Sequence, residues 1–260
     1  YTFPDKDLLD EFSLTTPTWL SAITKSDQYS KQGLSADLET LRTYYLDRGY
    51  LKFHINSTQV SITPDKKDIY ITINITEGDQ YKIRVVTLSG DLVVPAEEIF
   101  PLIDINPGDV FSRKRVTESV DKISSLLGNQ GYAFANVNTV PEMDDETNEV
   151  SLGFFVDPGK RVYVRPINIS GNVSTRDEVL RREMRQMEAG WYSAEKVERS
   201  RTRLDRLGYF EDVNVETPNV PGTTDQLDVN YSVTEISSGS VTAGMGFAQS
   251  SGIVFNASVQ

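Results

Sequence analysis

The chain of 260 residues contains no cysteine and a single histidine, His54. Without thiols it cannot form disulfides, zinc–thiolate sites or a cysteine nucleophile. One imidazole argues against a multi-histidine metal centre and against a histidine-based catalytic triad. A chain without cysteine also tolerates an oxidising compartment such as the periplasm. We therefore expect no bound metal.

Excess positive charge and long apolar runs are missing as well. The formal net charge is −12, which argues against coating of DNA or RNA, because phosphate binding requires a local excess of lysine and arginine. No stretch approaches the ~20 apolar residues of a transmembrane helix. The sequence contains no glycine-rich phosphate loop, nucleophile elbow or paired-carboxylate pocket. These absences predict a protein that is not an enzyme, has no catalytic residues and carries no cofactor.

What the sequence does contain is a repeat with a period of roughly 80 residues. Each copy has a helical pattern that ends at a glycine followed by a tyrosine, and glycine there is the usual left-handed helix cap. In the first two copies one face is apolar with the spacing i, i+4, i+7, i+11. In the third, Ser193 stands at the first position and is interpreted as an N-cap. The glycines are Gly49, Gly131 and Gly208, and the stripes are Leu34, Leu38, Leu41 and Tyr45; Val116, Val120, Ile123 and Leu127; and Val197, Ser200 and Leu204.

Two strands follow each glycine, and the second alternates with period two, which indicates one face on a core. In the second and third copies a further strand (81–88 and 161–169) and a short helix (96–103 and 175–187) precede the long helix. The unit is β-α-α-β-β, an α+β fold with two helices covering a three-stranded sheet. Copy one lacks its first strand, and we expect Tyr1 to lie just after it. The alternating residues are Ile69, Ile71, Ile73 and Ile75; Val150, Leu152, Phe154 and Val156; and Leu227, Val229, Tyr231 and Val233.

This unit, with Gly-Tyr after its second helix and Ser-Gly-Asp or Ser-Gly-Asn after its first strand, resembles the POTRA (polypeptide-transport-associated) domain. The whole chain resembles the periplasmic part of the outer-membrane protein assembly factors, most specifically over 37–42, 44–50, 74–81 and 179–188. The resemblance implies the last three POTRA modules of that family, joined to the start of its membrane barrel. The expected boundaries are 1–78 for a module lacking its first strand, 79–158 and 159–237 for two further modules, and 238–260 for the first two strands of an incomplete outer-membrane β-barrel.

The last segment also carries a pattern of its own. Apolar residues alternate with small or polar residues over 241–248 and again over 253–260, around a turn at 249–252. Two strands of about nine residues match the ~9–11 residues of a tilted membrane strand. The alternative is an ordinary hairpin packed on a soluble sheet. The position after the third module favours the barrel interpretation.

By the resemblance, the modules are binding scaffolds, and the strand after each Gly-Tyr lies at an edge of its sheet. An exposed edge can accept an added strand from a partner. In copy one the apolar positions change phase between Asn56 and Gln59, which is typical of a β-bulge. Similar changes occur over 134–137 and 210–213. The bulges could instead only protect the edges from aggregation. The candidate docking residues are Lys52, His54, Asn56, Ser57, Thr58 and Gln59.

A charged stripe is predicted on the helix 175–187 and just after it. Thr175 and Glu178 match a capping box, and the expected buried residues are Leu180, Met184 and Met187. The resemblance implies that this surface of the last module binds an accessory lipoprotein, BamD, and that BamB binds at the earlier modules. The alternative is a solvated helix face held by i, i+4 ion pairs. The candidate partner-binding residues are Arg181, Arg182, Arg185 and Glu188.

Together these features predict a scaffold in the periplasm, attached to the outer membrane through the full-length protein. It would bind unfolded outer-membrane proteins by β-augmentation and hold accessory lipoproteins for folding and insertion, without nucleotide or nucleic acid. An alternative is the POTRA region of a related outer-membrane transporter that secretes one dedicated substrate. A hydrolase domain on a repeat scaffold is a third hypothesis, disfavoured because the sequence offers no catalytic constellation.

Overall fold

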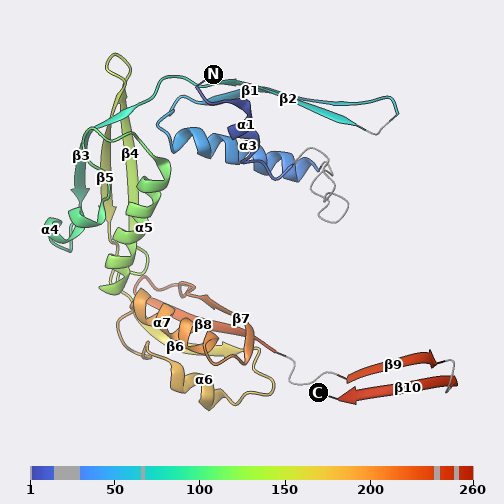
Figure 1. Cartoon of the computed structure of the whole chain (residues 1–260). Helices are drawn as coiled ribbons and strands as arrows, with labels where there is room; N and C mark the ends of the chain where they lie inside the picture. The colour runs from blue at the N-terminus through green and yellow to red at the C-terminus, as the bar shows by residue number, and fades with distance from the viewer. Residues whose placement is uncertain (1, 15–29, 66–67, 237–240, 249–251, 260) are drawn as a thin grey trace. The chain divides into compact units, whose positions relative to one another are not determined.

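The computed structural model describes residues 2–14, 30–65, 68–236, 241–248 and 252–259 (Figure 1). The chain divides into two compact units. One comprises Tyr1–Ser124 and Ala135–Pro158, and the other comprises Ser125–Phe134 and Gly159–Gln260. Among the described residues no helix is both long enough and apolar enough to cross a membrane.

The first sheet has two antiparallel strands, β1 (His54–Ile62) and β2 (Ile69–Thr76), preceded by α1 (Asp5–Leu9) and α3 (Lys31–Leu46). The α3 stripe faces the core as expected, with Leu34, Leu41 and Tyr45 buried and Leu38 half-buried. The core is strongly aromatic, because Tyr45 stacks on Phe53 with ring centroids 4.2 Å apart. The register of β1 against β2 shifts between Ile55 and Ser57, so the predicted bulge exists and lies at Asn56, at the start of the range where the apolar positions change phase.

The second sheet contains β3 (Lys82–Gly90), β4 (Asn136–Asp144) and β5 (Glu149–Asp157) in the order β3-β5-β4. β3 runs parallel and β4 antiparallel to the central β5. α4 (Ala96–Ile99), a 3₁₀ turn η1 (Phe100–Leu102) and α5 (Arg113–Asn129) complete this copy (Figure 1). The expected bulge over 134–137 is wrong: β4 pairs continuously with β5 from Asn136, so the phase change falls where the strand begins. The four alternating residues of β5 are all buried.

The third sheet has the same order, β6-β8-β7, with β6 (Tyr163–Ser170), β7 (Phe210–Glu216) and β8 (Gln226–Glu235). Its helices are α6 (Asp177–Glu183) and α7 (Ala194–Asp205). The stripe of α7 is buried as predicted, and the Ser193 side chain caps the helix by accepting from Lys196 N. The register of β7 shifts between Phe210 and Asp212, as expected for a bulge.

A glycine stands at the C-terminal end of β3 and of β6, the strands that run parallel to the central strand of each sheet. Gly90 ends β3 with φ +102°, and Gly171 follows β6 with φ +89°. A Cβ atom would lie 2.1 Å from Val156 O at the first position and 1.9 Å from Val233 O at the second. Glycine is required at both, because any side chain would overlap the central strand.

The C-terminal segment forms the predicted hairpin, with β9 (Val241–Ala248) antiparallel to β10 (Gly252–Val259). Gly252 lies opposite Ala248, so the pairing closes around the expected turn. The turn itself, 249–251, falls outside the described residues. Met245 is the one described side chain of the hairpin, and it is exposed; the expected alternation of the other side chains lies outside what is described.

Candidate protein-binding surfaces

The strand after each helix-ending glycine lies at the edge of its sheet. In the part of the chain that is described, β1 pairs with β2 alone, β4 with β5 alone and β7 with β8 alone. We call β1, β4 and β7 the open-edge strands. Because a strand at an edge presents unpaired N–H and C=O groups, each is a template for one further strand.

In the two three-stranded sheets, the outer edge of β3 and of β6 is hydrogen-bonded near the start of the strand. Ile83 in β3 donates to Asp109 O (2.8 Å) and accepts from Gly108 N (2.7 Å). Val164 in β6 bonds in the same way to the segment 189–190, at 2.9 and 2.8 Å. The loop before each long helix therefore covers part of the edge opposite the open-edge strand.

The six candidate docking residues divide into two groups. His54, Thr58 and Gln59 lie on β1, together with two residues that hold the bulge. Asn56 donates to Thr76 Oγ1 (2.9 Å) and Ser57 accepts from Asn74 (2.8 Å), so both side chains bond across to β2. The bulge is thus fixed by paired side chains, while the backbone edge of β1 stays open.

Lys52 lies apart from this edge. Its Nζ is 2.6 Å from Asp145 Oδ2, and the hydroxyl of Tyr81 donates to Asp145 Oδ1 at 2.6 Å. The Lys52 ammonium, and then the Tyr81 hydroxyl, hold the pKa of Asp145 below its ordinary value. Lys52 is therefore engaged within its own unit.

The charged stripe is not helical throughout, so its predicted geometry is wrong. α6 ends at Glu183, and Met184 leaves it with ψ 137°. Arg185 therefore lies in irregular chain after the helix, and Glu188 lies in the turn that follows it. Met187, expected to be buried, is 70% exposed.

The predicted capping box at Thr175 is also wrong. Arg176 occupies the N-cap position without a capping side chain. The N–H groups of Ser174 and Thr175 instead donate to Glu235 at 2.8 and 2.7 Å. These hydrogen bonds stabilise the charged carboxylate and lower the pKa of Glu235 to about 2.

A buried glutamine explains why α6 stops. Gln186 is 2% exposed; its amide donates to the carbonyls of Met187 and Trp191, and its Oε1 accepts from Ser193 N. The Arg185 N–H donates to Ser200 Oγ at 2.8 Å. The sequence alone did not predict that α6 stops here, because Ser193 and Ser200, which bond to Gln186 and Arg185, lie just before and on α7.

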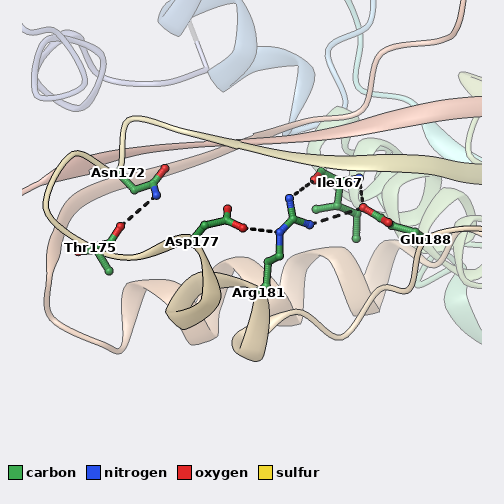
Figure 2. A network of polar contacts seen from close by, with 6 residues as sticks. All are labelled: Ile167, Asn172, Thr175, Asp177, Arg181 and Glu188. Carbon is green, nitrogen blue, oxygen red and sulfur yellow. Dashed lines mark hydrogen bonds and ion pairs between the residues drawn. The ribbon is translucent and has the colours of Figure 1, made fainter.

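Glu188 and Arg181 meet over β6 (Figure 2). Glu188 Oε1 accepts from Ile167 N at 2.8 Å and lies 3.6 Å from Arg181 Nη1. Arg181 also bonds to Asp177 Oδ2 (2.6 Å) and Ile167 O (3.3 Å). The network supplies partners to a backbone position next to Pro166, where the pairing of β6 with β8 is irregular.

Arg182 and Arg185 carry the remaining charge. The Arg182 side chain is 76% exposed and lies 3.7 Å from Glu183 Oε1. Arg185 donates to the carbonyls of Arg182 and Met184. With Arg181, Glu188 and the exposed Met187, these residues form what we call the α6 surface: four charged side chains and one apolar side chain on α6 and the segment after it.

A family model, described as "POTRA: Surface antigen variable number repeat", matches residues 1–78, 81–159 and 162–236. The chain belongs to the POTRA family. The α+β modules seen in the structure confirm the fold that the sequence predicts.

Within the POTRA family the chain matches BamA. It is 35% identical over 258 residues to the outer membrane protein assembly factor BamA of Neisseria meningitidis serogroup B, covering 99% of this chain and 32% of that protein. It is 34% identical to BamA of Buchnera aphidicola, covering 98% and 41%. The chain thus spans less than half the length of these relatives.

A solved structure gives the same match. The crystal structure of Haemophilus influenzae BamA POTRA3-5 has 33% sequence identity and a TM-score of 0.80, covering 90% of this chain and 92% of that one. BamA from Haemophilus ducreyi lacking POTRA domains 1-3 has 36% identity and a TM-score of 0.54 over 69% of this chain and 34% of that one. The resemblance to the BamA POTRA region is therefore confirmed.

Proposed function

We propose that this chain is the periplasmic scaffold of an outer-membrane β-barrel assembly factor, attached to the outer membrane through the rest of its protein. The observation that carries the proposal is the similarity of the whole row of modules to BamA POTRA3-5. The proposed boundaries are 1–78, 79–158 and 159–237 for the modules. In the same proposal, 238–260 forms the first two strands of the barrel.

The scaffold binds unfolded outer-membrane proteins by β-augmentation at its open-edge strands, β1 first. Backbone hydrogen bonds give affinity that depends little on client sequence, which suits a machine with many clients. The bulge at Asn56 twists the edge, and Thr58 and Gln59 extend beyond it along β1. These residues are the proposed contact with an added strand.

Photocrosslinking in the assembled envelope tests this contact. A photoreactive residue at Gln59 should crosslink to several unrelated outer-membrane proteins while they are being synthesised. The same residue at Arg42, exposed on α3, is the matched control and should give little product. Equal yields at the two positions would contradict docking at β1. Crosslinks to one dedicated substrate alone would favour the transporter alternative.

BamD binds the α6 surface, and BamB binds the earlier modules. Arg182 and Arg185 offer guanidinium groups for charge-assisted pairs, and Met187 offers an apolar contact. The Ile167 N–H donates to Glu188 Oε1, which is also the Glu188 oxygen nearest to Arg181, so Oε2 is the oxygen proposed to face a partner cation. A partner cation can therefore pair with it without breaking the network.

Matched variants separate binding from folding at Glu188. Glu188→Lys should abolish recovery of BamD in a pull-down, but it also removes the acceptor of the Ile167 N–H. Glu188→Gln keeps an acceptor for that N–H and loses the charge, so it should weaken recovery while leaving exchange of the Ile167 amide unchanged. Arg185→Glu should weaken recovery as well. Normal recovery with Glu188→Gln and Arg185→Glu would show that Glu188 acts only within the fold.

A further inference from the structure

A second set of contacts recurs where one POTRA module follows another. Asp47 Oδ1 accepts from Lys114 N at 2.7 Å, and Asn129 Oδ1 accepts from Glu195 N at 2.7 Å. Asp47 and Asn129 each stand two residues before a helix-ending glycine. Lys114 and Glu195 are each the second residue of the long helix in the following module. Each unit of the structure contains one of these junctions.

Two further hydrogen bonds repeat beside the first. Gly49 O accepts from Tyr81 N at 2.9 Å, and Gly131 O accepts from Val162 N at 2.8 Å. The residue before Tyr81 or Val162 then reaches back with its side chain. Gln80 donates to Arg48 O at 2.9 Å, and Arg161 donates to Gln130 O at 2.6 Å. Each junction thus has three hydrogen bonds. In all three, the acceptor lies at the helix end of one module and the donor belongs to the next module.

The first turn of a helix leaves N–H groups without intrahelical acceptors. Ser112 and Ser193 bond to the third N–H of α5 and α7, both at 3.4 Å. The N–H of the second helix residue, Lys114 or Glu195, donates instead to the side chain of Asp47 or Asn129. The preceding module therefore completes the cap of the next module's helix.

The third copy departs from the pattern. The residue two before Gly208 is Arg206, and a guanidinium group has no acceptor. A Cβ atom on Gly208 would meet nothing within 4 Å, whereas on Gly49 it would lie 2.8 Å from Val110 Cγ1 and on Gly131 2.9 Å from Arg161 Cγ. Within the part of the chain that the structure describes, no group approaches Gly208 as Val110 approaches Gly49 and Arg161 approaches Gly131.

We propose that the residue two before the helix-ending glycine determines whether another POTRA module can dock. A side-chain oxygen at this position accepts the second N–H of the following helix, as Asp47 and Asn129 do. Arginine at this position excludes that contact, so a POTRA helix end such as that of Arg206 does not receive a further module. The partner recognised by Asp47 and Asn129 is the N-terminal turn of a POTRA long helix.

Amide exchange in the full chain tests the proposal. Asp47→Arg should speed exchange at Lys114 and Tyr81 roughly fivefold or more, as for the loss of a helix cap, whereas Asp47→Asn keeps the oxygen and should not. Asn129→Arg should act in the same way at Glu195 and Val162. Gln130→Ala is the control, because only the backbone of Gln130 takes part. Amides inside β2 and β5 should exchange normally throughout, which shows that the modules remain folded.

A distance measurement gives a second readout. Because the chain has no cysteine, a double variant Arg42→Cys and Asp121→Cys carries spin labels at those two positions and nowhere else. Both positions are exposed and lie within one unit. The distance distribution should broaden in Asp47→Arg and stay narrow in Asp47→Asn. Unchanged exchange and distances in Asp47→Arg would overturn the proposal. Equal loss in both variants would also overturn it, since the oxygen would then not be the determinant.

Discussion

Lys52 Nζ lies 2.6 Å from Asp145 Oδ2, and Tyr81 donates to the other oxygen of the same carboxylate. Because the ammonium is the largest cause of the lowered pKa of Asp145, Lys52→Met should raise that pKa towards its ordinary value. Tyr81→Phe should raise it less. A titration of the Asp145 carboxylate followed by NMR measures both shifts, and an unchanged midpoint in Lys52→Met would contradict the pairing.

Glu235 makes stability depend on pH. Its pKa is lowered from an ordinary 4.5 to about 2 by the Ser174 and Thr175 N–H groups. A lowered pKa in the folded state stabilises the fold above the unfolded pKa, and this contribution is lost as pH falls from 4.5 towards 2. Glu235→Gln should therefore show a smaller loss of unfolding free energy over this range than the parent chain. Denaturant unfolding at several pH values measures it, and parallel curves would refute the assignment.

Gly90 and Gly108 form a matched pair for the cost of a side chain. Both have positive φ, +102° and +91°, so alanine at either pays roughly 1–2 kcal/mol of backbone strain. At Gly108 a Cβ meets nothing within 4 Å, but at Gly90 it overlaps Val156 O. Gly90→Ala should lower the unfolding free energy by at least about 2 kcal/mol more than Gly108→Ala. Equal losses in denaturant unfolding would show that the strand end relaxes around the methyl group.

Glu183 is a largely buried carboxylate that depends on Arg203. Arg203 Nη2 and Nε lie 2.6 and 2.8 Å from Glu183 Oε2, and the Glu183 side chain is 11% exposed. Arg203→Met should cost about 2–4 kcal/mol, because it leaves the buried carboxylate with only the exposed and more distant Arg182 guanidinium, 3.7 Å away. The control Arg199→Met breaks an exposed pair with Glu195 on the same helix and should cost under about 0.5 kcal/mol. Thermal or denaturant unfolding distinguishes the two variants. Similar costs would mean that the Glu183 carboxylate becomes hydrated when Arg203 is removed.

Local patterns predicted most of the fold. The i, i+4, i+7, i+11 stripe placed α3 and α5, and the serine at the head of α7 caps that helix because its side chain reaches Lys196 N, three residues on. Period-two alternation placed β5 and β8, since every second residue of each strand is buried in the core of its module. These features depend on residues close together in sequence.

The α6 surface could not be predicted in the same way. The run from Arg181 to Met187 contains good helix formers, and sequence spacing alone extended the helix to its end. Gln186 and the Ser200 hydroxyl instead hold the chain in a turn after Glu183. The junction bonds of Asp47 and Asn129 were equally invisible, because their acceptor role depends on an N–H group more than 60 residues away.

The strand order of the two complete sheets limits how much each module can hold. With one edge partly closed by the loop before the long helix, each of these two modules offers one fully open edge to an incoming strand. An outer-membrane barrel needs at least roughly eight strands, so these edges accommodate only a minority of one client. Under the proposed function, occupancy is therefore transient: strands must depart towards the membrane while later ones are still arriving.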